Sequence, residues 1–299
     1  MDLIDLHTHT TASDGSLTPA ELVKAARAAG LSAVAVTDHD TIDGLAEALT
    51  AGSHLGLEVI PGVEISVQRG HNPGGMHMLG LFVDHTDPGL AEALKRLQKA
   101  RAERNPKMVA RLNGLGIDLT MAEVASFADG GQVGRPHFAQ ALVARGVVGD
   151  VNQAFDRYLA AGKPAYVPKF RFKPQEAMAM LRRAGAVPVL AHPGLLRLSR
   201  DDLESLVKGL KKNGLEGVEA AYSDHKPALT RFLKSLAARL DLAVSGGTDF
   251  HGAAKPAIRL GLGKGDLRVP ARFLHDLKAR RQRMLAAGRR EVRFHSPNR

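Results

Sequence analysis

Two histidines stand one residue apart near the start of the chain, directly after a short apolar run. In the stretch "DLHTHTTASDG" they are His7 and His9, and Asp14 follows in the same stretch. Residues two apart in an extended strand share one face, so both imidazoles would point the same way. Imidazole and carboxylate are ligands that divalent metal ions accept. One such pair is weak evidence, and the rest of the chain must supply further ligands.

Similar side chains recur beside the other apolar runs. Asp249 and His251 in "SGGTDFHG" repeat the spacing of His7 and His9. A single histidine beside an apolar run is more often a core or loop residue, and an aspartate there more often caps a helix. Six histidines and three carboxylates at equivalent places nevertheless favour bound metal, and so many ligands predict two or three ions. The nine candidate ligands are His7, His9, Asp14, His39, Glu64, His77, His192, Asp249 and His251.

The apolar runs that position these ligands predict seven short strands, most of them separated by amphipathic helical stretches. This alternation is typical of βαβ units and a parallel sheet. In parallel α/β barrels the active site lies at the carboxyl ends of the strands, so the candidate ligands are expected at one rim. The predicted strands lie at 3–6, 33–36, 58–63, 76–83, 186–190, 216–220 and 242–245.

One long region lacks strand signals. From 94 to 167 the residue pattern is typical of helices interrupted by short polar segments. Thr120 opens a capping box there. Thr18 opens another capping box before the first predicted helix, and Ser199 similarly opens a helix that ends near Gly214. The sequence therefore predicts a barrel in two parts, at 1–93 and 168–299, with a helical insertion at 94–167.

Composition excludes several kinds of site and location. The 299 residues are 44% hydrophobic and include no cysteine, which rules out disulfides and thiolate metal ligands. The chain does not open with a basic stretch and an apolar run, as a signal peptide does. No apolar run approaches the roughly 18–20 residues that span a bilayer. We expect a cytoplasmic protein with no membrane partner, and no obligate protein partner is evident.

The formal charge of +10 favours partners that carry phosphate, such as nucleotides or nucleic acid. Part of this charge lies in the stretch 278–290, "KARRQRMLAAGRR", which is typical of the solvated face of a last helix. The charge alone therefore does not identify a partner.

With these residues in view, the sequence resembles the PHP (polymerase and histidinol phosphatase) superfamily of metal-dependent phosphoesterases. The stretches "DLHTHTTASDG", "VTDHDT", "PGVEIS", "MHMLG", "LAHPG" and "SGGTDFHG" are similar to its successive motifs, in order. The resemblance implies an α/β fold, a distorted seven-stranded (β/α)7 barrel with an inserted helical cap domain. Within the superfamily the chain resembles the TrpH or RNase AM branch, because "VGRPHFA" at 133–139 and "GKPAYVP" at 162–168 are similar to its signatures.

The resemblance also implies how the ligands divide among divalent ions. His7, His9, Glu64 and Asp249 would hold a first ion, and Glu64 would bridge to a second ion held by His77 and His192. The third ion would be held by Asp14, His39 and His251. A carboxylate at Asp14, where some relatives have histidine, favours Mn²⁺ over Zn²⁺, and Fe²⁺ or Mg²⁺ are further possibilities.

These ions would supply a metal-bound hydroxide at neutral pH, so the expected catalyst has no protein nucleophile. A phosphate that is not cleaved needs cations away from the metals, and arginine binds phosphate best. We expect Arg135, Lys163 and Arg197 to bind this spectator 5′-phosphate, although each is also compatible with a plain surface cation.

The activity that fits is hydrolysis of the 3′-phosphate of a 3′,5′-bisphosphonucleotide, such as adenosine 3′,5′-bisphosphate, to AMP and phosphate. A 5′→3′ exoribonuclease acting on short 5′-phosphorylated RNA is the first alternative, followed by a histidinol-phosphatase-like enzyme. From another class, a non-catalytic nucleic-acid-binding module with a structural metal fits less well, because structural sites are usually filled by four ligands.

Overall fold

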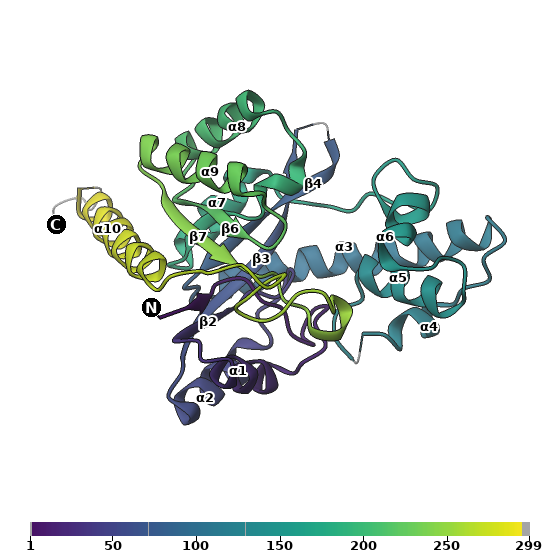
Figure 1. The fold of residues 1–299 in the computed structure, drawn as a ribbon. Coiled ribbons are helices and arrows are strands. Elements are labelled where there is room, and N and C mark those ends of the chain that lie inside the picture. Colours follow the sequence, from purple (N-terminus) through teal and green to yellow (C-terminus); the bar gives the residue numbers. More distant parts are fainter. Residues whose placement is uncertain (1, 71, 129, 295–299) are drawn as a thin grey trace.

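The computed structural model describes residues 2–70, 72–128 and 130–294, and seven strands form one sheet in chain order (Figure 1). The seven predicted strands are confirmed. The strands are β1 (Ile4–Asp5), β2 (Ala33–Val36), β3 (Glu58–Arg69), β4 (Asn72–Leu81), β5 (Val187–Leu190), β6 (Gly217–Tyr222) and β7 (Ala243–Gly247).

The sheet curves until its first and last strands lie side by side. The backbone N–H of Leu6 donates to the carbonyl of Gly246 at 3.1 Å, and Asp249 N–H donates to the His7 carbonyl at 2.9 Å. These bonds make a nearly closed barrel. They also bring the residues that follow β1 and β7 together, although more than 230 positions separate them in the sequence.

The prediction of a wholly parallel sheet is wrong for one strand. β4 runs antiparallel to both β3 and β5, whereas the other neighbouring pairs are parallel. Only residues 70 and 71 separate β3 from β4, and a parallel pair needs a crossover of about a dozen residues. A hairpin is therefore the only connection open to these two strands.

Helices cover the outside of the barrel (Figure 1). The predicted capping box at Thr18 is confirmed, because its side chain accepts from Glu21 N–H while the Glu21 carboxylate accepts from Thr18 N–H. The Ser199 side chain likewise caps a helix by accepting from Asp202 N–H. The barrel helices are α1 (Pro19–Ala28), α2 (Leu45–Leu55), α7 (Pro174–Arg183), α8 (Arg200–Lys212), α9 (Pro227–Arg239) and α10 (Arg272–Phe294).

Strand β2 shows how the sequence divides the core in two. Ala33 and Ala35 join an inner cluster, while Val34 and Val36 join the cluster beneath the outer helices. Alternate residues of a strand face opposite sides, so the two alanines of β2 face the interior and its two valines meet the helices. Leu277 of α10 belongs to the inner cluster, so α10 helps to close the barrel.

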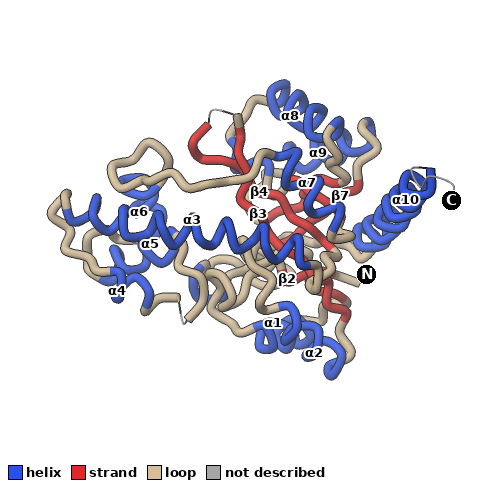
Figure 2. Tube along the Cα trace, turned by 180° about the vertical axis from the view of Figure 1, so that it is seen from behind, coloured by secondary structure: helices blue, strands red, loops and turns tan. Residues whose placement is uncertain are grey.

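A helical cap with its own apolar core stands beside the barrel (Figures 1 and 2). Leu94 near the start of its long first helix packs in the barrel core, whereas Leu112 near the end of that helix packs in the cap core. One continuous helix thus joins the two parts, and the domain limits at 93 and 167 stay predictions. The helices here are α3 (Pro88–Asn113), α4 (Met121–Ala125), α5 (Arg135–Ala144) and α6 (Val151–Ala154), with a π-helical turn (Phe155–Leu159).

We use "cap" below for residues 108–167, the span of this second core. The capping box predicted at Thr120 is confirmed at the start of α4. Within the described residues, no helix has both the length and the apolar content that crossing a membrane requires.

Candidate metal centre

The structure brings all nine predicted ligands together at one rim of the barrel. Two residues follow β1, one follows β2, one follows β5 and two follow β7, while Glu64 and His77 lie within β3 and β4 and Asp14 lies in the turn before α1. Among the described residues they form four groups whose ligand atoms lie within 4.8 Å of one another, and no further residue joins them. The groups are His9, Asp14, His39 and His251; His7, His9 and Asp249; His7, Glu64 and His192; and His39, Glu64 and His77.

The backbone is bent sharply where several strands deliver their side chains to this centre. His192 has a φ of 27° and Asp249 a φ of 58°, in the left-handed region that side chains other than glycine rarely adopt. Such residues cost about 1–3 kcal/mol each and persist where surrounding structure holds them. Here the bend after β5 and the bend after β7 turn a histidine and an aspartate towards the same point.

Glu64 is the central carboxylate of the cluster. Its Oε1 lies 2.9 Å from His77 Nδ1 and 2.8 Å from His192 Nε2. Its Oε2 lies 2.9 Å from His39 Nδ1 and 3.3 Å from the Nε2 atoms of both His7 and His9. Burial raises the pKa of Glu64, but these imidazoles outweigh it and hold the pKa well below its usual range. One buried carboxylate therefore faces five imidazoles in its ionised form.

Several polar atoms of this cluster are buried without a hydrogen-bond partner. Both ring nitrogens of His9, Nε2 of His7 and Oε2 of Glu64 are in this state. Buried polar atoms are paired in the large majority of cases, so a concentration of unpaired ones calls for an explanation. Burial lowers the pKa of His9, but Asp249 and Glu64 raise it to about 9. The carboxylates thus stabilise positive charge at the centre of the cluster, and a divalent cation fits there.

A second layer of residues orients the histidines, and sequence reasoning missed its main member, Glu219. His7 Nδ1 donates to Glu219 Oε1 at 3.0 Å, which leaves Nε2 to face the cluster. The other oxygen of Glu219 accepts from the backbone N–H of His192 at 2.6 Å. Partners of this kind fix the tautomer and direction of metal-binding imidazoles. The signal in the sequence was an acid within the otherwise uncharged strand "GVEAAY".

Asp249 is oriented in the same way. Its Oδ2 accepts from the Tyr222 hydroxyl at 2.9 Å and from Lys255 Nζ at 2.7 Å. Its Oδ1 is left facing His9 Nε2 at 3.2 Å. His251 Nδ1 donates to the backbone carbonyl of Asp249 at 2.8 Å and so turns Nε2 towards the neighbouring carboxylate of the cluster. The donors and acceptors of this layer leave one side-chain atom each of His7, Asp249 and His251 to face the centre.

A cavity of about 190 Å³ opens beside the cluster, and we call it the cationic pocket. Three residues of the cluster form one wall, and basic side chains from α3, α5 and the segment after the cap form much of the rest. The cluster residues are Asp14, His39 and His77, and the basic residues are Arg101, Arg104, Arg135, Lys169 and Arg171.

Two of these arginines lack a counter-charge. No carboxylate lies within ion-pair distance of Arg104 or Arg135 in the described part of the chain, and Arg104 Nη2 is buried with no hydrogen-bond partner. Burial and neighbouring arginines lower the pKa of Arg104 to about 9, and burial does most to lower the pKa of Arg135 to about 10. Uncompensated buried cations are costly, so this pocket is suited to an anion.

Asp40 holds two basic side chains in place on the other side of the pocket. Its Oδ2 accepts from Arg101 at 2.5 Å and from Lys169 Nζ at 2.8 Å, and its Oδ1 accepts from the N–H of Ser66. Burial raises the pKa of Asp40, but Lys169 and Arg101 hold it far below the usual range. Burial lowers the pKa of Lys169 to about 7 despite the attraction of Asp40. Asp40 therefore fixes cations from two separate segments at the wall of the pocket.

Of the three predicted phosphate-binding residues, only Arg135 lines this pocket. Its guanidinium lies 5.7 Å from the ring centre of Phe155 and 5.8 Å from that of Tyr166. Lys163 and Arg197 are exposed and line neither this pocket nor the larger cavity described next. Their roles stay predictions.

The sequence did contain signals for the basic residues that were missed. Arg101 and Arg104 occupy positions of α3 on the buried face that also carries Leu94 and Leu97. Arginines at core-facing positions of a helix are rarely left there without a role. Lys169 belongs to the stretch "KFRFK", in which basic and aromatic residues alternate.

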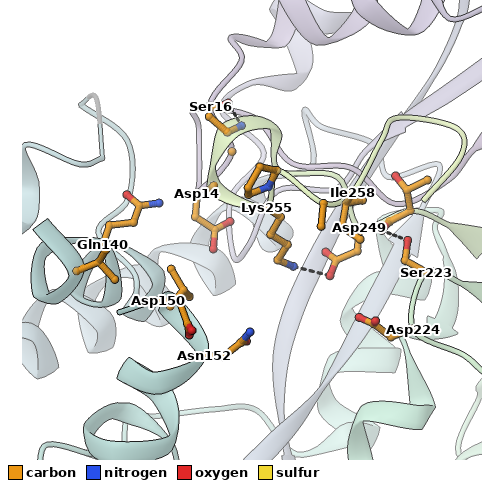
Figure 3. A pocket seen from close by; sticks show the side chains of 18 of the residues that line it. Asp14, Ser16, Gln140, Asp150, Asn152, Ser223, Asp224, Asp249, Lys255 and Ile258 are labelled. Carbon is orange, nitrogen blue, oxygen red and sulfur yellow. Dashed lines mark hydrogen bonds and ion pairs between the residues drawn. The ribbon is translucent and has the colours of Figure 1, made fainter. Parts of the chain in front are cut away.

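A second, larger cavity of about 920 Å³ reaches the same cluster, and we call it the large cavity. Figure 3 shows Gln140 and Asn152 of the cap on one side of it and Ser223 of the barrel on the other. Asp14 and Asp249 connect it to the metal centre. Its two lysines are both paired, Lys255 with Asp249 and Lys264 with Asp224.

Comparison with known proteins agrees with this geometry. The sequence profile of the PHP domain matches residues 5–163. The 3′,5′-nucleoside bisphosphate phosphatase of Chromobacterium violaceum is 36% identical over 83% of this chain and 87% of its own length. The 5′-3′ exoribonuclease Rnm of Escherichia coli is 37% identical over 87% of this chain and 88% of its own. A crystal structure from Bifidobacterium adolescentis, assigned as a metal-dependent phosphoesterase, superposes with a TM-score of 0.83 at 32% identity, covering 93% of this chain and 96% of that one.

Proposed function

The chain belongs to the PHP domain family, and from that premise we propose that it removes the 3′-phosphate from a 3′,5′-bisphosphonucleotide held by its 5′-phosphate. It is a hydrolase of phosphate esters, and its cluster of histidines and carboxylates fits divalent metal ions. The name of the Chromobacterium violaceum relative supports the choice of substrate.

The observation that carries the proposal is the position of the cationic pocket. It shares Asp14, His39 and His77 with the metal centre, and it holds two arginines without counter-charge, Arg104 buried and Arg135 half-buried. A nucleotide whose 5′-phosphate lies among these arginines is expected to present its 3′-phosphate to the cluster. Binding energy from the phosphate that does not react would then hold the reacting one in place.

We propose that the nine residues hold two or three divalent ions, with Mn²⁺ preferred because imidazole and carboxylate ligands prevail and Asp14 adds a hard oxygen. The division of ligands stays as the family resemblance implies, with Glu64 shared by two ions. When bound, such ions polarise phosphoryl oxygens and make water a nucleophile at neutral pH.

The side chains of the chain then have positioning and charge-balancing roles. Arg104 and Arg135 bind the 5′-phosphate, and Asp40 keeps Arg101 and Lys169 at the pocket wall. Glu219 fixes the ring of His7, as described above. None of these roles requires a nucleophilic side chain, in agreement with the expected direct attack of water.

Features of the cavities favour one of two alternative activities over the other. A 5′→3′ exoribonuclease would cut the same 3′ ester, and the large cavity beside the centre together with the Escherichia coli relative favours it as the second candidate. Histidinol phosphate fits less well, because its ammonium group would be repelled by the uncompensated arginines of the cationic pocket. A cytoplasmic location stays a prediction from the sequence.

The test is turnover of adenosine 3′,5′-bisphosphate by protein reconstituted with Mn²⁺. Phosphate and AMP should appear in equal amounts, a chelator should stop the reaction, and added Mn²⁺ should restore it. Histidinol phosphate should react far more slowly under the same conditions. Faster release from histidinol phosphate, or undiminished turnover of both in the chelator, would remove the proposal.

A further inference from the structure

The cationic pocket is strongly positive before any ligand enters it. Basic side chains make up much of its lining, and Asp14 is the only carboxylate among the described residues that line it. Asp40, behind the wall, balances one positive charge through its bonds to Arg101 and Lys169. Salt screens buried and partly buried charges much less than exposed ones, so the positive field of the pocket persists in solution.

Asp40 fixes part of this charge relative to the metal ligands. It directly follows His39 in the sequence, and its backbone N–H donates to the carbonyl of Glu64 at 2.9 Å. Its carboxylate at the same time accepts from Arg101 and Lys169. Because one residue is bonded to both sides, these two cations cannot move away from the metal centre.

The two arginines without counter-charge are held as well. Arg104 Nε donates to Asn105 Oδ1 at 2.9 Å. The guanidinium of Arg135 lies over the rings of Phe155 and Tyr166. Fixed positive charge of this kind is offset best by an anion that enters the pocket.

One of the four groups of candidate metal ligands contributes its only carboxylate to the wall of this pocket. The group consists of His9, Asp14, His39 and His251, and both Asp14 and His39 line the pocket. With one carboxylate, the group leaves a divalent ion with a net positive charge. Repulsion between like charges is strong where little water separates them. The cations of the pocket are therefore expected to weaken the binding of an ion to this group.

The large cavity on the other side of the centre exerts no such repulsion. Its lysines are paired, Lys255 with Asp249 and Lys264 with Asp224. No unpaired lysine or arginine is among the residues that the structure describes in its lining. The uncompensated charge thus acts on the metal centre from the side of the cationic pocket.

We propose that the cationic pocket makes the metal centre depend on its substrate: an anion in the pocket strengthens the binding of a divalent ion to Asp14, His39 and His251. This inference rests on the proposed function, because the anion concerned is the anchoring 5′-phosphate. Coupling between two binding sites is reciprocal, so the ion strengthens the binding of the anion by the same factor. A nucleotide with a 5′-phosphate thus completes the centre at which its 3′-phosphate reacts, whereas a 3′-monophosphate does not.

The experiment measures Mn²⁺ binding in place of turnover. Mn²⁺ is titrated into protein that a chelator has freed of metal, and the free ion is followed by electron paramagnetic resonance. The probe is 3′-deoxyadenosine 5′-monophosphate, which carries the anchoring phosphate but has no 3′-oxygen that could bind the ion. The control ligand is 3′-deoxyadenosine, which lacks the phosphate. A titration without protein corrects for Mn²⁺ that the probe itself binds.

The probe should lower the half-saturating concentration of the most weakly held ion by at least about fivefold, the lower end of typical couplings between sites. The nucleoside should not change it. Without the probe, Arg104→Gln should bind this ion several-fold more tightly than the wild type, because one repelling charge is gone, and the probe should then have less effect. Arg104→Lys keeps the charge and should respond as the wild type does. Arg145→Gln, outside the pocket, should do the same.

An Mn²⁺ titration that the probe leaves unchanged, or that the nucleoside shifts equally, overturns the inference. A full response to the probe in Arg104→Gln, with the circular dichroism spectrum of the wild type, also overturns it. Hydrolysis of adenosine 3′,5′-bisphosphate at saturating Mn²⁺ is measured on the same wild-type preparation. Turnover without coupling leaves the proposed function standing, whereas coupling without turnover supports the inference and removes the proposed function.

Discussion

The cationic pocket and the large cavity meet at one metal centre but have opposite character. The first is small and holds arginines without counter-charge, whereas the second is large and its lysines are paired. A charged site with unpaired cations is suited to phosphate, and a neutral site with amides and apolar walls is suited to a nucleoside. The difference supports the proposed orientation of the substrate, with its 5′-phosphate in the cationic pocket.

The largest effect is expected at Glu64, the central carboxylate of the cluster that both cavities reach. Glu64→Gln should lower hydrolysis of every substrate by at least about a thousandfold, since metal ions supply several kcal/mol and each 1.4 kcal/mol is about tenfold in rate. Bound metal should fall as well, measured by elemental analysis of the purified protein. Glu58→Gln, at the exposed start of the same strand, is the control. Full metal content with full activity in Glu64→Gln would contradict a shared carboxylate.

Glu219→Gln should slow the hydrolysis of every substrate by the same factor. It removes the carboxylate that orients His7, and it changes no contact with the substrate. Loss of such a second-layer partner typically weakens metal binding by about 10- to 100-fold. Titration with Mn²⁺ should therefore show a higher half-saturating concentration, and excess metal should restore most of the turnover. If excess metal restored nothing, the positioning role would be wrong. Glu216→Gln, just before β6, is the matched control.

Arg104→Gln should weaken the binding of phosphate in the cationic pocket only. Loss of a hydrogen bond to a charged group is worth about 1.5–3 kcal/mol, so inhibition by the product 5′-AMP should weaken by at least about tenfold. Inhibition by inorganic phosphate at the centre should change little. Arg145→Gln, a cap arginine paired with Glu123 outside the pocket, should leave both inhibition constants unchanged. Equal weakening of both inhibitors by Arg104→Gln would mean that the pocket does not select the 5′-phosphate.

The smallest expected effect is a pH dependence of 5′-phosphate binding in the cationic pocket. Burial lowers the pKa of Lys169 to about 7, so its positive charge is present below that pH and is lost as the pH rises through it. The preference for the bisphosphate over 3′-AMP should fall a few-fold between about pH 6 and 8. Arginine stays charged throughout, so Lys169→Arg should flatten this fall. An unchanged slope in Lys169→Arg would exclude Lys169 as its source.

The clustering of the nine candidate ligands could be predicted from the sequence because they follow a local rule. Strand ends and i, i+2 spacings are visible in stretches such as "DLHTHT", and the closing of the sheet brings distant ends together. The direction of β4 was not predicted, because a short connection between β3 and β4 overrides the general rule of parallel strands. The strand count and the helix caps followed from apolar runs and capping residues, so they were recovered.

The anion site was harder to predict because its residues come from three separate segments. Arg101 and Arg104 lie on a helix that the pattern shows as amphipathic, and nothing local indicates that its buried face meets the barrel rim. Lys163 and Arg197 were chosen for their nearness to motifs in the sequence, yet nearness along the chain does not place a residue in a cavity. Only the packing of the cap against the barrel defines the pocket.

The most direct test of the account is the ratio of kcat/KM for adenosine 3′,5′-bisphosphate to that for 3′-AMP, measured on one Mn²⁺-loaded preparation. Both substrates carry the same reacting phosphate, and only the first carries the anchoring one. We predict a ratio of at least about a hundred, the effect of two charge-assisted hydrogen bonds. A ratio near one would show that the cationic pocket does not hold the 5′-phosphate, and the proposed orientation of the substrate would be wrong.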